Sequence, residues 1–149
     1  MAPELLNKLF VVNGIAARIT EVEAYTADDE ASHSFRGQTK RNAVMFGEAG
    51  HWYVYLIYGM HYCVNLVTGD EGDGQAVLIR AVAVEGVPVK QTTGPGRLTR
   101  ELGIDMSMNG VKAPLFDDGI ASPTRPLVTK RIGITKAAEL PRRWLLPHC

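Results

Sequence analysis

The dipeptide Asn13-Gly14, which stands between two apolar runs, constrains the fold of this chain more than any other feature. Both residues accept the left-handed backbone of a tight turn, and Asn-Gly between apolar runs is the strongest short signal of a β-hairpin. We therefore expect strands over residues 8–12 and 15–25. Side chains alternate between the two faces of a strand. One face of the second strand should carry Ile19, Glu21, Glu23 and Tyr25, and the other face Thr20, Val22 and Ala24.

More strands are expected in the middle of the chain. Residues 52–58 and 61–67 are rich in tyrosine, valine and other strand formers, and Gly59-Met60 predicts a hairpin turn between them. Tyr58 then projects from the tip of this hairpin. An acidic turn over residues 69–74 leads into a further strand over 76–84, where Arg80 is the only charged residue.

Helix signals are fewer. Thr39 is a candidate cap for a short helix that runs through Asn42 to Phe46. The segment Gly94-Pro95-Gly96-Arg97-Leu98 should open a second helix, with Leu98 and Leu102 on one face and Gly103 as its stop. Beyond this helix, prolines separate short strands and turns.

Size and composition favour one globular domain over residues 1–149, because this length supports one modest core. Apolar residues make up 46% and charged residues 21% of the chain, which excludes a disordered protein. No apolar run approaches the roughly 20 residues that span a bilayer, and the first residues lack a signal-peptide layout, so we expect a cytoplasmic protein. Cys63 and Cys149 lack metal-ligand spacing, and we expect both thiols to be reduced.

The net charge is zero, but the charges are unevenly distributed along the chain. Residues 1–85 carry 6 Lys and Arg against 11 Asp and Glu, whereas residues 86–149 carry 10 against 5. A basic half could face phosphates, and two ordinary solvated surfaces explain the same numbers equally well.

Single candidate residues have ordinary explanations. A glutamate on a strand face, such as Glu23, is usually solvated, and a loop histidine such as His33 is usually bound to the backbone. Tyr53 and Tyr55 could pack a core, and Asn65 could satisfy a neighbouring backbone group. Two residues are harder to dismiss: Tyr58 exposes an aromatic ring at a turn, and Arg80 in an apolar strand is costly unless its guanidinium finds partners.

Several strings together carry a resemblance. They are Glu21-Val22-Glu23-Ala24-Tyr25, Ala31-Ser32-His33-Ser34, Thr39-Lys40-Arg41-Asn42-Ala43-Val44-Met45-Phe46, Tyr53-Val54-Tyr55-Leu56-Ile57-Tyr58-Gly59-Met60 and Val77-Leu78-Ile79-Arg80-Ala81. In order and approximate spacing, the chain resembles the alkyladenine (3-methyladenine) DNA glycosylase family. The resemblance runs from Leu5-Leu6-Asn7-Lys8 through Gly94-Pro95-Gly96-Arg97-Leu98, and more loosely to an expected strand at Arg131-Ile132-Gly133-Ile134.

The resemblance implies an α+β domain with a curved, mostly antiparallel sheet flanked by short helices. It also implies a monofunctional glycosylase of base-excision repair, which flips an alkylated or deaminated purine out of duplex DNA and hydrolyses its bond to deoxyribose. A base inside the duplex is out of reach, so it must rotate into a protein slot. The expected partner is double-stranded DNA that contains damaged purines. The expected enzyme is a nucleoid-associated monomer that needs no cofactor and no metal.

Family roles pass to individual residues by the same resemblance. Glu23 matches the general base, and Arg80 matches a residue that holds the attacking water and a nearby phosphate. Tyr25, His33 and Tyr55 match the residues that sandwich the extruded base, Asn65 matches a gate against guanine, and Tyr58 matches the wedge that fills the vacated stack. The candidates for DNA phosphate contacts are Arg36, Lys40, Arg41, Arg97 and Arg100.

The chain also departs from the family pattern. Little sequence precedes Leu5-Leu6-Asn7-Lys8, Asn7 stands where a glycine is usual, and His61 stands where an aromatic is frequent. The connection from residues 84–86 to Gly94 is shorter than the family's helical excursion. We expect these differences to reduce burial and DNA-contacting surface.

Two alternatives stay open at this point. A protein that has lost turnover could still grip distorted DNA with the same wedge, as a damaged-DNA binding module. A metal-dependent hydrolase could use Glu21, Glu23, Asp28, Asp29 and His33, although these residues lack a recognised ligand spacing.

Overall fold

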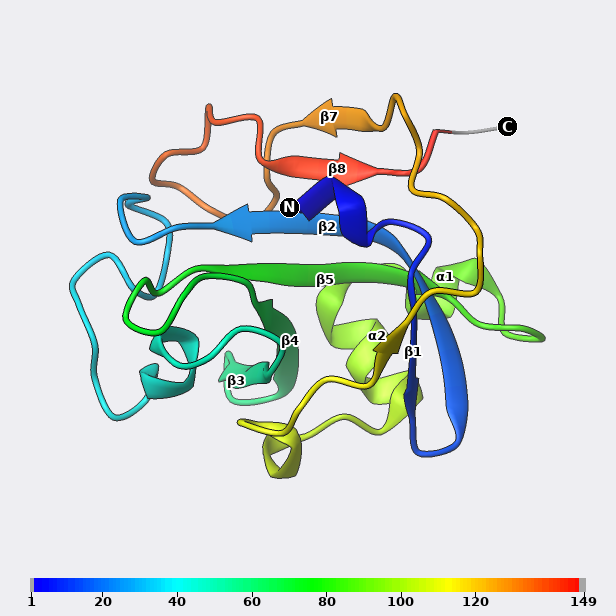
Figure 1. The fold of residues 1–149 in the computed structure, drawn as a ribbon, viewed down its shortest axis with the longest axis horizontal. Coiled ribbons are helices and arrows are strands. Elements are labelled where there is room, and N and C mark those ends of the chain that lie inside the picture. Colours follow the sequence, from blue (N-terminus) through cyan, green and yellow to red (C-terminus); the bar gives the residue numbers. More distant parts are fainter. Residues whose placement is uncertain (1, 148–149) are drawn as a thin grey trace.

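Eight strands form one curled antiparallel sheet in the computed structural model, which describes residues 2–147 (Figure 1). Along the main path of the sheet the strand order is β3-β4-β5-β2-β1-β6. The strands are β1 (Leu9–Val12), β2 (Ile15–Tyr25), β3 (Trp52–Ile57), β4 (His61–Val67), β5 (Ala76–Ala83), β6 (Leu115–Phe116), β7 (Leu127–Thr129) and β8 (Arg143–Leu145). The expected α+β fold with a curved, mostly antiparallel sheet is confirmed.

The helices are short, and the longest of them packs Leu98 and Leu102 into the main core. They are α1 (Val89–Thr92), α2 (Pro95–Leu102) and three 3-10 turns, η1 (Ala2–Leu5), η2 (Ala43–Phe46) and η3 (Met106–Met108). Helix α2 begins after Gly94 and ends at Gly103, whose φ of 71° is left-handed, as its sequence predicts. Among these helices none is long and apolar enough to cross a membrane.

Strand β2 organises the sheet, because it is long enough to take three partners. Strand β5 pairs with one edge of β2 over residues 18–25. On the other edge, β1 pairs with residues 15–18 and β8 pairs with residues 21–23. The chain's first hairpin and a segment close to residue 145 therefore meet on one strand, as the neighbouring arrows of β2 and β8 in Figure 1 show.

Both predicted hairpins are confirmed. Asn13 and Gly14 have φ values of 50° and 76°, and they join β1 to β2 with Val12 opposite Ile15. Tyr58 and Gly59 have φ values of 53° and 67°, and the turn places the Tyr58 side chain at the tip with 83% of its surface exposed.

The predicted alternation along β2 is wrong at Ile19. The register with β5 shifts on both sides of Glu21, so a β-bulge changes which face each side chain takes. As a result Ile19 and Val22, three residues apart, both lie in the main core with Ile79 and Val82 of β5. The bulge lets β2 place Ile19 and Val22 in the core while Glu21 and Glu23 pair with Arg80.

Three smaller expectations also need correction. The short helix begins at Ala43 with Asn42 before it, and Thr39 instead exchanges hydrogen bonds with Asn42. Residues 131–134 are a bent loop rather than a strand, and β7 ends just before them. Helix α1 lies inside the shortened connection, where no helix was predicted.

Local geometry explains the departure at Asn7 and shows where His61 lies. Asn7 has a φ of 72°, in the left-handed region that asparagine tolerates better than most residues, which is why a glycine suits this position. The His61 ring lies close to Gly96 of α2, since a Cβ built on Gly96 would come within 2.9 Å of His61 Cγ. Cys63 is a buried free thiol, and Cys149 lies outside the described residues.

Candidate active site

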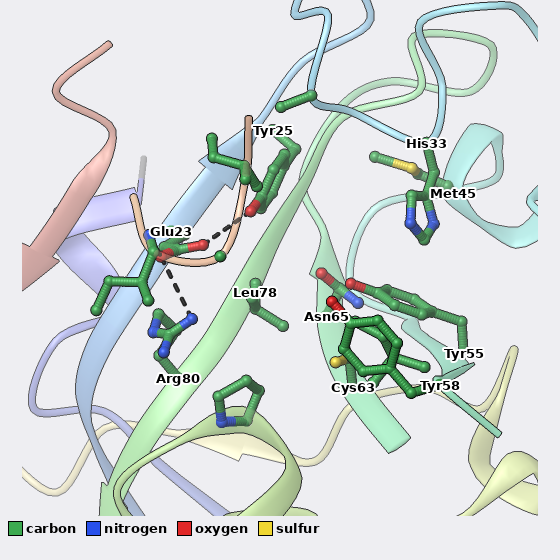
Figure 2. A pocket seen from close by; sticks show the side chains of 16 residues that line it. Glu23, Tyr25, His33, Met45, Tyr55, Tyr58, Cys63, Asn65, Leu78 and Arg80 are labelled. Carbon is green, nitrogen blue, oxygen red and sulfur yellow. Dashed lines mark hydrogen bonds and ion pairs between the residues drawn. The ribbon is translucent and has the colours of Figure 1, made fainter. Parts of the chain in front are cut away.

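A pocket of about 320 Å³ opens beside the second half of β2. This volume is at the lower end of the roughly 300–1,000 Å³ typical of ligand sites. Seven residues that the sequence singles out line it together: Glu23, Tyr25, His33, Tyr55, Tyr58, Asn65 and Arg80. Figure 2 shows Glu23, Tyr25 and Arg80 on one side of the pocket and His33, Tyr55 and Asn65 on the other.

Glu23 lies at the inner end of the pocket with none of its surface exposed. Its Oε1 accepts a hydrogen bond from the Tyr25 hydroxyl at 2.8 Å, and its Oε2 accepts one from the Ile132 backbone N–H at 2.9 Å. Arg80 Nη1 lies 3.4 Å from the same Oε2. These partners satisfy the buried carboxylate, and Oε1 retains a free lone pair for a further donor such as water.

Arg80 is held between two carboxylates. Its Nε donates to Glu21 Oε2 at 3.1 Å, while Arg143 Nε of β8 donates to the same oxygen at 2.8 Å. The bulge at Glu21 turns this side chain toward Arg80. The side chains therefore form a row in which positive and negative charges alternate. Each charge has an opposite neighbour in the order Arg143, Glu21, Arg80 and Glu23.

The Tyr25 hydroxyl stays protonated and available as a donor. Burial raises the pKa of Tyr25, and the adjacent Glu23 carboxylate raises it further. Behind the ring, the guanidinium carbon of Arg131 lies 4.7 Å from the ring centroid. The Tyr25 ring, one flat wall of the pocket, is thus held through its hydroxyl by Glu23 and through its face by Arg131.

Aromatic rings from two other segments form the opposite wall. The His33 ring lies 4.3 Å from the Tyr55 ring between centroids, and its Nδ1 shares a hydrogen bond of 3.0 Å with the Tyr53 hydroxyl. Burial lowers the pKa of His33, and the positive charge of Arg41 lowers it further. The imidazole is therefore neutral near pH 7 and offers a flat, uncharged surface.

The floor of the pocket is less polar than its end. Asn65 is 4% exposed, and its amide Nδ2 donates to the Tyr53 carbonyl at 3.1 Å. The expected bond to a neighbouring backbone group is therefore present, and the side chain still lines the pocket. Burial raises the pKa values of the Tyr55 hydroxyl and the Cys63 thiol, so both groups stay neutral.

The candidate phosphate contacts lie outside the pocket on exposed surface. Arg36, Lys40 and Arg41 belong to the loop between β2 and η2, and Arg97 and Arg100 lie on α2. Arg41 reaches the β3–β4 hairpin, where its Nη2 donates to the Leu56 carbonyl at 3.1 Å. Metal-ligand clusters are absent from the described part of the chain, since no three His, Cys, Asp or Glu side chains there could hold one ion.

Some groups at the site were not predicted. The Ile132 N–H on Glu23, the Arg131 guanidinium behind Tyr25, and Arg143 beside Glu21 all come from residues 131–143. A backbone N–H has no sequence signature. The arginines could have been noticed as charges that flank apolar residues, although their partners lie more than 100 positions away.

The sequence is similar to known proteins of one family. The model of one protein family, described as methylpurine-DNA glycosylase, matches residues 1–149. A protein of Methanoculleus marisnigri is 50% identical over 88% of this chain and 79% of its own length. Proteins of Burkholderia cenocepacia (43% identical, 99% of this chain, 82% of their length) and Rhodopseudomonas palustris (45%, 97%, 79%) are similar too. All three carry the name "Putative 3-methyladenine DNA glycosylase".

Proposed function

Because this chain belongs to the methylpurine-DNA glycosylase family, we propose that it excises damaged purines from duplex DNA in base-excision repair. It is a monofunctional 3-methyladenine DNA glycosylase, a hydrolase of N-glycosyl bonds, and DNA is its substrate. The single observation that carries the proposal is the fully buried Glu23 carboxylate at the end of an aromatic-walled pocket. The enzyme acts as a monomer in the cytoplasm, at the nucleoid.

The flipped purine occupies the space between Tyr25 and the His33–Tyr55 pair. Stacking on aromatic rings is worth roughly 1–3 kcal/mol per base and tolerates varied ring substituents. Alkylated and deaminated purines therefore fit one slot. Tyr58, exposed at the hairpin tip beside the pocket mouth, takes the place of the extruded base in the stack.

Glu23 acts as the general base in hydrolysis. Cleavage of the bond from purine to sugar builds positive charge on the sugar, which a nearby carboxylate stabilises. A water bound at Oε1 gives its proton to Glu23 as it attacks the sugar carbon, and the purine leaves with the bonding electrons. Arg80 keeps the carboxylate oriented, and it helps to hold the water and a nearby phosphate.

Asn65 gives the slot its selectivity. Guanine carries an amino group at C2 that adenine and hypoxanthine lack, and a rigid side chain facing that group excludes guanine by steric clash. The bond from Asn65 Nδ2 to the Tyr53 carbonyl supports this role, because it fixes the side chain in one rotamer.

The deciding experiment is a gel assay of abasic-site formation on duplexes that contain 3-methyladenine, hypoxanthine or no lesion. We expect the wild-type protein to release damaged purines and Glu23→Gln to lose about 10²- to 10⁴-fold in rate. The matched control is Glu21→Gln, which changes a neighbouring carboxylate outside the pocket lining and should cost less than about tenfold.

Three results would contradict the proposal. Tight lesion binding without abasic sites would make the protein a damaged-DNA binding module. A full rate in Glu23→Gln would remove the general base from its role. Loss of activity in excess chelator would point to the metal-dependent alternative.

A further inference from the structure

A buried ion pair lies behind the pocket and takes no part in the proposed chemistry. Asp29 is 2% exposed and Arg131 is 5% exposed. Both oxygens of Asp29 accept from the guanidinium of Arg131, and Oδ1 also accepts from the Ala31 backbone N–H at 3.0 Å. Buried charges are costly unless they are paired, and here the two charges face each other, while Nε of Arg131 is buried without a hydrogen-bond partner among the described residues.

The guanidinium of Arg131 joins three segments of the pocket wall. Nη1 donates to the Ala24 carbonyl of β2 at 3.0 Å, and Nη2 donates to the Ala137 carbonyl at 3.1 Å. Asp29 belongs to the loop that carries Ala31 and His33, both of which line the pocket. One side chain thus connects β2, the 26–37 loop and the 131–137 loop.

Arg131 also touches the two groups nearest the chemistry. Its guanidinium covers the Tyr25 ring at 4.7 Å, and Tyr25 donates to Glu23. The next residue, Ile132, gives its N–H to the other oxygen of Glu23. A lysine could not replace this planar fork, because its ammonium is a compact point charge with three donors and no face to stack.

We propose that Arg131, set by Asp29, is a positioning residue for base excision. It fixes the plane of the Tyr25 wall and holds the Ile132 N–H against Glu23. This inference rests on the proposed function. Its effect falls on the rate of base release and leaves the grip on DNA unchanged, since Arg131 is buried away from any surface that duplex DNA could reach.

The test compares Arg131→Lys and the double variant D29N/R131M with the control Arg142→Met. The double variant removes both charges, so no unpaired ion stays buried. Arg142 also lies near Asp29, at 3.5 Å, but it bonds Thr26 rather than a group of the pocket. Circular dichroism and thermal melting establish that each variant is folded at the assay temperature.

Two measurements separate positioning from general stability. The first is the single-turnover rate on a hypoxanthine duplex. The second is affinity for a duplex with a tetrahydrofuran abasic analogue, which puts no base in the slot. We expect Arg131→Lys and the double variant to lose about 10- to 100-fold in rate, with affinity for the abasic analogue within about twofold of wild type. Arg142→Met should keep both values within about twofold of wild type.

Other outcomes overturn the inference. A folded double variant with the wild-type rate would show that Arg131 does not position the site. An equal loss of rate and of abasic-duplex affinity, or failure of both Arg131 variants to fold, would reduce Arg131 to a stability residue. If the wild-type protein itself releases no base, the proposed function fails first, which is a distinct result.

Discussion

Glu23 and Tyr25 work as one unit at the scale of single residues. The Tyr25 ring forms a wall of the pocket, and its hydroxyl holds one oxygen of the buried Glu23 carboxylate. The ring stacks on the base and the hydroxyl orients Glu23. Affinity for damaged DNA reports the first role, and the rate of base release reports the second.

Tyr25→Phe should keep the wall and lose the orientation of Glu23. We expect the single-turnover rate of base release to fall about 5- to 10-fold, which corresponds to a hydrogen bond worth about 1–1.5 kcal/mol. Affinity for the damaged duplex should stay within about twofold of wild type. Tyr25→Ala, as the comparison, should also lose about 1–3 kcal/mol of binding. A Phe variant with the wild-type rate would show that the hydroxyl is dispensable.

Asn65→Ala should relax selectivity against guanine. The substitution leaves space where the amide stood on the floor of the pocket, and pocket contacts of this size discriminate by about 10- to 200-fold. We expect release of guanine to rise relative to release of hypoxanthine, measured on two otherwise identical duplexes. Cys63→Ala is the matched control on the same strand, and the ratio should not change there. An unchanged ratio in Asn65→Ala would leave Asn65 with a structural role only.

Sequence predicts much of this site, but only where side chains carry the signal. The seven pocket residues named from the sequence do line one pocket. Their roles come from the family resemblance, because a lone glutamate or tyrosine on a strand has an ordinary explanation. The Ile132 N–H was beyond prediction, since every residue but proline has such a group and its partner Glu23 is 109 positions away.

At the scale of secondary structure elements, the β3–β4 hairpin stores strain at its tip. Tyr58 has a φ of 53°, in a region where a residue with a Cβ is disfavoured, and its ring is 83% exposed. Folding alone gains nothing from an exposed aromatic ring in this conformation. Strain that the fold does not need is typical of a functional position.

Tyr58→Gly should therefore separate stability from DNA binding. Glycine adopts the left-handed region freely, so we expect the free energy of unfolding to stay equal or rise by up to about 1 kcal/mol. The same change removes the wedge, and affinity for the damaged duplex should fall at least tenfold, or about 1.4 kcal/mol. Urea titration and fluorescence anisotropy measure the two quantities. Unchanged affinity would contradict the wedge assignment.

The sequence predicts the hairpins and helix α2 more readily than the β-bulge and the bent loop. Asn13-Gly14, the tyrosine-rich hairpin and the glycine that ends α2 depend on local backbone preferences, so the sequence predicts them well. The bulge at Glu21 needs knowledge of β5, because it is a mismatch between two strands about 60 positions apart. The strand expected at residues 131–134 from the family resemblance is a loop, because the Ile132 N–H bonds the Glu23 side chain instead of a neighbouring strand.

At the scale of the whole molecule, a neutral protein binds a polyanion through the placement of its charges. Lys and Arg match Asp and Glu at 16 each, so net charge cannot drive DNA binding. Many acidic groups are paired internally, including Glu21, Glu23 and Asp29. The exposed cations of α2 and of the loop between β2 and η2 are then available to face phosphates.

Binding should consequently depend steeply on salt. Each phosphate contact contributes a slope of about −0.9 to a plot of log affinity against log salt, so five contacts predict about −4 to −5. Anisotropy titrations between about 50 and 200 mM salt give the slope. Lys40→Ala and Arg100→Ala should each flatten it by about one. Lys112→Ala is the control, and a slope near zero in the wild-type protein would exclude the proposed contacts.

The free energy of unfolding should depend on pH, because the folded protein holds His33 in its neutral form. Its pKa is lowered from the ordinary 6.5 in the folded protein, so below that pH the unfolded chain takes up the proton first. The free energy of unfolding should therefore fall as pH drops below 6.5, until the folded-state pKa is passed. Urea titrations at about pH 7.5 and 5.5 should show a smaller difference for His33→Gln than for wild type. Equal differences would contradict the lowered pKa.

The pairing of β8 with β2 has a consequence for how the protein is made. A ribosome delivers β2 early, and the strand can fold with β1, β3, β4 and β5 while the segment from 126 onward is still being synthesised. Such an unfinished chain holds Glu23 without the Ile132 N–H and Tyr25 without its backing arginine. The proposed site is therefore incomplete until the segment from 126 onward has been made and has paired with β2.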